Sequence, residues 1–156
     1  MAKVKIGDKA LDFTLQSSTG ERVTLAQFFG KKNIVLFFYP MDESPVCSRE
    51  AEAFRDNYEV FKKLDAEVIG VSSQSVDSHK EFASHHNLPF ILLSDSRNSV
   101  RKLYGVSTTL RVVPGRVTYV IDKKGIIKYM FSSQFHPAKH AEEAISALKR
   151  TEVSSN

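Results

Sequence analysis

The single cysteine of this 156-residue chain lies where a reactive thiol is expected. Cys47 follows Ser44, a good helix N-cap, and Pro45, a good first helical residue. The thiol would then lie in the first helical turn, beside free backbone amides and the positive end of the helix dipole. Both features favour the thiolate, which is the nucleophilic form of cysteine. Cys47 is therefore a candidate nucleophile, the alternative being a small hydrophobe at the start of an apolar helix face.

Two neighbouring residues favour the nucleophile. Pro40 ends the preceding apolar run and has no N–H group to offer a thiolate or water. The Ser44 hydroxyl can donate a hydrogen bond to a bound oxygen while it accepts one from a backbone amide. The order P-x-x-x-S-x-x-C therefore indicates a site where a thiolate meets a bound oxygen.

Other combinations of reactive residues are weaker candidates. His136 and His140 have a spacing that can bind a metal on a helix, but no third ligand is apparent. The pair His85 and His86 is interpreted as a helix end. There is no glycine-rich phosphate loop and no CxxC pair, so we expect neither a cofactor nor a metal. Loop or capping roles are expected for three acidic residues: Asp12, Asp42 and Glu43.

The elements that must position Cys47 follow from hydrophobic patterning. Alternation on both sides of a Ser-Thr-Gly turn predicts a hairpin over residues 12–25. The apolar run 33–40 is typical of a central strand buried on both faces. Apolar residues then recur at helical spacing from about 44 to 64, which predicts one helix. Its apolar face comprises Cys47, Ala51, Phe54, Tyr58 and Phe61.

The rest of the chain alternates strands and helices before it ends in a hairpin and a helix. Strands are expected at 67–73 and 89–95, helices at 75–87 and 99–105, a hairpin over 116–131 and a closing helix over 136–150. This order predicts a single α/β domain over residues 1–156. We expect a thioredoxin-like fold: a mixed central sheet with helices on both faces and an N-terminal β-hairpin.

Composition excludes several classes of protein. No segment approaches the roughly 18 consecutive apolar residues of a membrane span. The net charge of +4 comes from scattered or paired lysines and arginines, so we expect no nucleic-acid partner. One cysteine excludes an intrachain disulfide and favours a reducing compartment, most simply the cytoplasm. A mature organellar protein whose targeting peptide had been removed would show the same sequence features.

Residues 37–56 resemble the active-site segment of the peroxiredoxins, P-x-x-x-[T/S]-x-x-C, and especially their Q-type branch, also called bacterioferritin comigratory proteins. The resemblance covers nearly the whole chain, including residues 7–40, 88–95 and 116–131. It implies a thiol peroxidase that reduces hydrogen peroxide and alkyl hydroperoxides to water and alcohols.

The resemblance also implies roles for five residues. Cys47 would be the peroxidatic cysteine, Ser44 would steer the peroxide, and Pro40 would shield the thiol from water. The arginine of the family falls on Arg116, which would stabilise the thiolate and the departing oxygen. Glu50 matches a position that hydrogen-bonds within the active site. Two other arginines are weaker candidates for the task of Arg116: Arg49 and Arg111.

The chain departs from its relatives in one respect. Many Q-type members carry a resolving cysteine where this chain has Glu52, and others carry it in the following helix, where residues 81–86 contain none. We therefore expect a one-cysteine cycle in which glutathione, glutaredoxin or thioredoxin reduces the sulfenic acid. The alternative is a redox-responsive binding or sensor protein without efficient turnover. We expect a monomer or weak homodimer.

Overall fold

The computed structural model describes residues 4–106, 116–134 and 136–154. Within them lies a seven-stranded mixed sheet with the strand order β2-β1-β5-β4-β3-β6-β7. Its strands are β1 (Thr14–Ser17), β2 (Arg22–Thr24), β3 (Asn33–Phe38), β4 (Ala66–Ser72), β5 (Ile91–Ser94), β6 (Val117–Ile121) and β7 (Ile127–Ser132). The helices are η1 (Leu25–Phe28), α1 (Pro45–Asp56), α2 (Tyr58–Lys63), α3 (Val76–His85), α4 (Ser99–Tyr104) and α5 (Pro137–Ser154).

The apolar strand β3 lies inside the sheet, as its sequence predicts. It pairs in parallel with β4 and antiparallel with β6. Five of its six residues, from Ile34 to Phe38, are buried, because both faces of the strand are covered. The N-terminal hairpin is formed by β1 and β2, and the second predicted hairpin by β6 and β7. The expected mixed sheet with an N-terminal hairpin is therefore confirmed.

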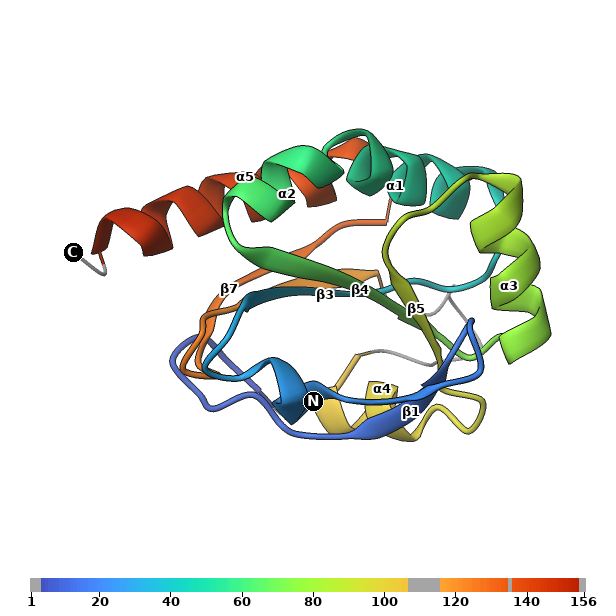
Figure 1. The fold of residues 1–156 in the computed structure, drawn as a ribbon, viewed down its shortest axis with the longest axis horizontal. Coiled ribbons are helices and arrows are strands. Elements are labelled where there is room, and N and C mark those ends of the chain that lie inside the picture. The colour runs from blue at the N-terminus through green and yellow to red at the C-terminus, as the bar shows by residue number, and fades with distance from the viewer. Residues whose placement is uncertain (1–3, 107–115, 135, 155–156) are drawn as a thin grey trace.

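Helices cover both faces of the sheet (Figure 1). On one face, α1, α2 and α5 lie together, and the core below them includes Phe37, Phe54 and Leu148. On the other face, α4 and η1 cover a second core that includes Phe38 and Tyr104. Because α1 follows the end of β3, its first turn lies at the edge where that central strand stops.

The prediction of one helix from 44 to 64 is wrong in one detail. The helix ends at Asp56 and a second begins at Tyr58, with Asn57 between them. The Asn57 side-chain amide donates to the Ala53 carbonyl at 2.8 Å, competing with the regular helical hydrogen bonds. The apolar face survives the break: Cys47, Phe54 and Phe61 are buried and Tyr58 is half-buried.

None of the helices in the described ranges is both long and apolar enough to cross a membrane.

Candidate active site

The first turn of α1 positions Cys47 as its sequence predicts. Ser44 is the N-cap, and its hydroxyl accepts a hydrogen bond from the Cys47 amide at 3.3 Å. Pro45 is the first helical residue, so both predictions for this helix start are confirmed. The Ser44 hydroxyl donates only a long hydrogen bond, of 3.5 Å, to the Met41 carbonyl. The Ser44 hydroxyl can therefore donate its hydrogen bond to another oxygen at little cost in free energy.

Arg116 joins Cys47 to Glu50. Its Nη1 atom lies 3.3 Å from the Cys47 sulfur and 2.7 Å from Oε1 of Glu50. Cys47 and Glu50 are three residues apart on α1 and therefore share one helix face. All three side chains are almost fully buried; Cys47 is 2% exposed. A buried guanidinium in contact with the sulfur stabilises the thiolate more than the same contact would in water.

The charge of the sulfur also acts on Arg116. Burial alone would lower the pKa of the Arg116 guanidinium, but the negative charges of Glu50 and Cys47 outweigh burial and raise this pKa. The two anionic groups therefore stabilise the charged guanidinium, and the guanidinium in turn favours the ionised form of each.

Glu50 is a buried carboxyl group that can be protonated or ionised near neutral pH. Burial raises the pKa of Glu50 to about 7, although the charge and hydrogen bond of Arg116 act in the opposite direction. Within the described residues, neither Oε2 of Glu50 nor Nε of Arg116 has a hydrogen-bond partner. The carboxyl can thus exchange a proton near neutral pH without leaving its place beside Arg116.

His140, on α5, is a neighbour of Glu50 that the sequence analysis considered only as a metal ligand. Its Nδ1 atom lies 3.4 Å from Oε2 of Glu50 and 2.7 Å from the Thr118 hydroxyl. Nε2 donates to the Ser133 carbonyl at 2.9 Å. Burial lowers the pKa of His140 to about 4, so the ring is neutral near pH 7 and Nδ1 accepts from the Thr118 hydroxyl. The sequence does hold one signal for the burial of His140: it lies four residues before Ala144, on the apolar face of the helix.

The neutral state of His140 makes stability depend on pH. In the unfolded chain this histidine takes up a proton near its ordinary pKa of 6.5, whereas in the folded chain it does so only near 4. Its contribution is therefore complete above pH 6.5 and is lost as the pH falls toward 4. We expect His140→Gln, which keeps a donor and an acceptor, to become more stable relative to wild type by up to about 3 kcal/mol between pH 7 and 4.

Urea denaturation of wild type and His140→Gln at several pH values measures this difference. The exposed His136 supplies the matched control, since His136→Gln makes the same chemical change at the surface instead of in the core. A constant difference between His140→Gln and wild type from pH 7 to 4 would contradict a buried neutral histidine.

Arg101, on α4, is a second buried arginine near the thiol that the sequence analysis missed. It donates from Nη2 to the Tyr39 carbonyl at 2.8 Å, just before Pro40. Burial lowers the pKa of Arg101, and the charges of Asp95 and Cys47 act to raise it. Its charge therefore adds to the positive potential around the sulfur. Only its place on a short amphipathic helix distinguished it from a surface arginine.

A buried polar network holds the loop before α1. The Tyr39 hydroxyl donates to Oδ1 of Asp42 at 2.6 Å, and Oδ2 lies 2.7 Å from Nδ1 of His79 on α3. Nε2 of His79 donates to the Leu93 carbonyl on β5 at 2.9 Å. Asp42 thus has the loop role that its sequence position suggests, and the network fixes residues 39–42 against two elements.

The structure brings together four of the five residues expected at the site: Cys47, Ser44, Glu50 and Arg116. The fifth, Pro40, is half-buried in the loop between β3 and α1. Arg49 is exposed, and Arg111 falls outside the described residues. His136 is exposed whereas His140 is buried, so the two do not form the pair that their spacing permits.

The chain is similar to known proteins over most of its length. The model of the AhpC/TSA family matches residues 6–130. Peroxiredoxin Q, chloroplastic, of Triticum aestivum is 49% identical over 148 residues, 94% of this chain and 68% of that protein. The protein of the same name from Sedum lineare is 48% identical over 149 residues, 95% of this chain and 80% of that protein.

Solved structures of similar proteins share the fold. Peroxidoxin BcpB of Mycobacterium tuberculosis superimposes with a TM-score of 0.89 at 33% identity, covering 94% of this chain and 97% of that one. A mutant of PrxQ from Xylella fastidiosa gives a TM-score of 0.86 at 31% identity, covering 96% and 98%. The thioredoxin-like peroxiredoxin fold expected from the sequence is thereby confirmed.

Proposed function

Because this chain belongs to the AhpC/TSA family and to its peroxiredoxin Q branch, and is therefore a thiol-dependent peroxidase, we propose that it works in a one-cysteine cycle on hydrogen peroxide and alkyl hydroperoxides. The observation that carries the proposal is the contact of Arg116 with both the Cys47 sulfur and Glu50. This contact places a fixed positive charge beside the buried thiolate. Because arginine stays protonated, Arg116 does not give up a proton to the sulfur.

In the first half of the cycle, the Cys47 thiolate attacks one oxygen of the peroxide. A sulfur–oxygen bond forms as the O–O bond breaks, and two electrons pass from the sulfur to the departing oxygen. Arg116 and the Ser44 hydroxyl donate hydrogen bonds to the oxygens as negative charge develops. The departing oxygen takes up a proton and leaves as water or an alcohol, and Cys47 becomes a sulfenic acid.

The other two residues of the site support this step. Glu50 holds Arg116 through the 2.7 Å contact, so that the guanidinium is in place before the peroxide arrives. Pro40, half-buried in the loop between β3 and α1, offers no N–H group and limits the access of water to the thiolate. With a pKa near 7, Glu50 is also able to release or accept a proton during the cycle.

In the second half, an external thiol must reduce Cys47, because the chain has no other cysteine. A first thiolate attacks the sulfenic sulfur, releasing water and leaving a mixed disulfide; a second thiol then frees Cys47. Glutathione with glutaredoxin, or thioredoxin, are the proposed donors. The cytoplasm supplies such thiols, as does the chloroplast that the names of the plant relatives give for those proteins.

The cycle is tested by treating the reduced protein with one equivalent of hydrogen peroxide in the absence of thiols. Mass spectrometry should show one added oxygen, and a sulfenic-acid trap such as dimedone should label Cys47, with no disulfide formed. Addition of glutathione plus glutaredoxin, or of thioredoxin with its reductase, should then restore the thiol and allow repeated turnover.

Two results would decide against the cycle. Failure of all these donors to restore the thiol would favour the sensor, which is oxidised once per chain without turnover. Rapid dimerisation through a Cys47–Cys47 disulfide would show that a second copy resolves the sulfenic acid.

We also propose that residues 1–156 act as a single domain and as a monomer or weak homodimer. Only three large hydrophobic side chains are exposed within the described residues: Ile6, Met41 and Leu103. Three such side chains are too few to form an extended apolar interface.

A further inference from the structure

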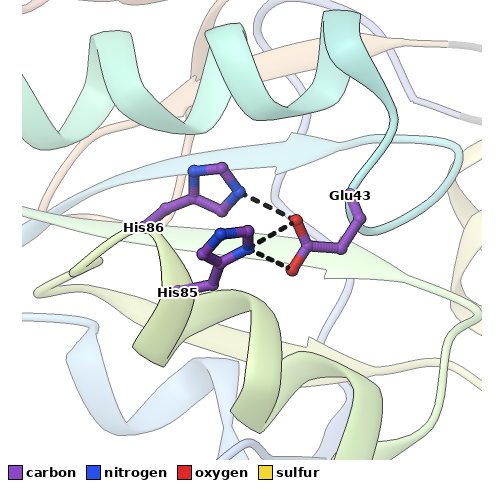
Figure 2. Close-up of side chains that lie close together, drawn as sticks. All are labelled: Glu43, His85 and His86. Atoms are coloured by element: carbon purple, nitrogen blue, oxygen red, sulfur yellow. Dashed lines mark hydrogen bonds and ion pairs between the residues drawn. The ribbon is translucent and has the colours of Figure 1, made fainter.

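We propose that Glu43, His85 and His86 form a binding site for a divalent transition metal ion, best fitted by Zn²⁺. The three side chains converge from two elements: Glu43 lies in the loop just before α1, and the histidines lie at the end of α3 (Figure 2). This inference is independent of the peroxidase cycle, and it departs from the sequence expectation that the chain binds no metal.

The distances suit a small cation. Nδ1 of His85 lies 3.1 Å from each Glu43 carboxylate oxygen, and Nε2 of His86 lies 2.9 Å from Oε1. All the potential ligand atoms lie within 4.8 Å of one another. Zinc bonds of about 2.0–2.1 Å in a tetrahedron place neighbouring ligand atoms about 3.3 Å apart. Small side-chain rotations are therefore enough to admit the ion where hydrogen bonds now join the three groups.

A second carboxylate prepares His86 as a ligand. Oε2 of Glu52, on α1, lies 3.0 Å from Nδ1 of His86, on the side of the ring away from Glu43. In metal sites a ligating histidine typically donates its other N–H to a carboxylate, which fixes the tautomer and increases the basicity of the ligating nitrogen. Glu52 thus directs Nε2 of His86 toward the proposed ion.

The types of ligand select among metals. Two imidazoles and one carboxylate suit Zn²⁺, whereas Mg²⁺ and Ca²⁺ prefer sites made of oxygen atoms. Two histidines with one glutamate, and a water in the fourth position, is an arrangement known for zinc.

Exposure makes the site accessible without rearrangement of the core. The side chain of His85 is 70% exposed and that of Glu43 is 43% exposed, so an ion can enter from solvent. His86 is only 14% exposed and serves as the fixed ligand. An ion held by all three would cross-link the loop before Ser44 to the end of α3.

Calorimetric titration of the metal-free, reduced protein with Zn²⁺ tests the site. We expect one ion per chain and at least a roughly 10-fold loss of affinity in His85→Ala, Glu43→Gln and His86→Ala. Glu52→Gln, which removes only the partner of His86, should weaken binding about 10-fold, within the range for such outer residues. His136→Ala is the matched control: it removes an exposed histidine elsewhere and should leave affinity unchanged.

Cobalt provides a readout that distinguishes this site from binding by the thiol. Co²⁺ should give visible bands of a low-symmetry nitrogen and oxygen site without the thiolate-to-metal charge-transfer band that Cys47 would produce, and the spectrum should be the same in Cys47→Ser. Because His85 is mostly exposed, His85→Ala should fold normally. This variant therefore tests the proposed metal site even if His86→Ala is unstable. Absence of Zn²⁺ binding, wild-type affinity in His85→Ala, or loss of binding in Cys47→Ser would each overturn the proposal.

Discussion

Replacing Cys47 with serine should reduce thiol-dependent peroxide reduction to the uncatalysed background, a loss of at least roughly 10⁶-fold, the low end of enzymatic rate accelerations. The chain has no other thiol to form the sulfenic acid. A serine hydroxyl stays protonated at neutral pH and is a far weaker nucleophile than a thiolate. Peroxide consumption with glutathione and glutaredoxin, or with thioredoxin, measures the loss.

Serine is a suitable replacement because it preserves the shape of the site. Its smaller oxygen can accept the hydrogen bond that Arg116 donates to the sulfur at 3.3 Å. Far-ultraviolet circular dichroism and the melting temperature should therefore change little, which separates lost chemistry from lost folding. Catalytic peroxide removal by a folded Cys47→Ser protein would show that another group performs the reaction.

Replacing Arg116 with alanine should slow the oxidation of Cys47 by peroxide roughly 10²- to 10³-fold, the effect of removing one donor from a developing oxyanion. Arg116→Ala removes the positive charge beside the sulfur and the donor to the departing oxygen. Stopped-flow measurement of the first oxidation isolates this step from reduction by the external thiol. The matched control is Arg49→Ala, which removes an exposed arginine of the same helix and should leave the rate unchanged.

The stability of Arg116→Ala must be measured together with its oxidation rate, because the substitution breaks the buried ion pair between Arg116 and Glu50. Loss of one partner from such a pair typically costs about 3–5 kcal/mol. Glu50 can avoid part of this cost by taking up a proton, since burial already raises its pKa to about 7. The double variant Arg116→Ala, Glu50→Gln also removes the unpaired charge of Glu50. It should therefore be folded, and its Cys47 should still be oxidised slowly. A wild-type rate in the folded single or double variant would contradict the role of Arg116.

Local signals in the sequence were sufficient to predict the start of α1. Ser44 and Pro45 act through contacts within one turn, so their types determine the cap without reference to the rest of the fold. The apolar face from Cys47 to Phe61 was also readable, because helical spacing repeats locally. The break at Asn57 was missed, although an asparagine able to bond to the carbonyl four residues earlier is a recognisable signal for a helix end.

Contacts between distant parts of the chain could not be derived from spacing. Arg116 and Cys47 are 69 positions apart, and only the resemblance to peroxiredoxins singled out this arginine among several. His140 and Arg101 were missed as neighbours of the site because their burial depends on how α5 and α4 pack on the sheet. The Glu43, His85 and His86 cluster likewise forms only when the end of α3 meets the loop before α1.

The central claim is that Arg116 and the start of α1 stabilise the thiolate of Cys47 by placing positive charge beside its sulfur. The direct measurement is the ultraviolet absorbance of the thiolate as a function of pH, with Cys47→Ser as the blank. The account predicts that at a given pH the thiolate absorbance of the wild type exceeds that of Arg116→Ala, because the variant lacks the positive charge beside the sulfur. Coincident absorbance curves of the two proteins would contradict it.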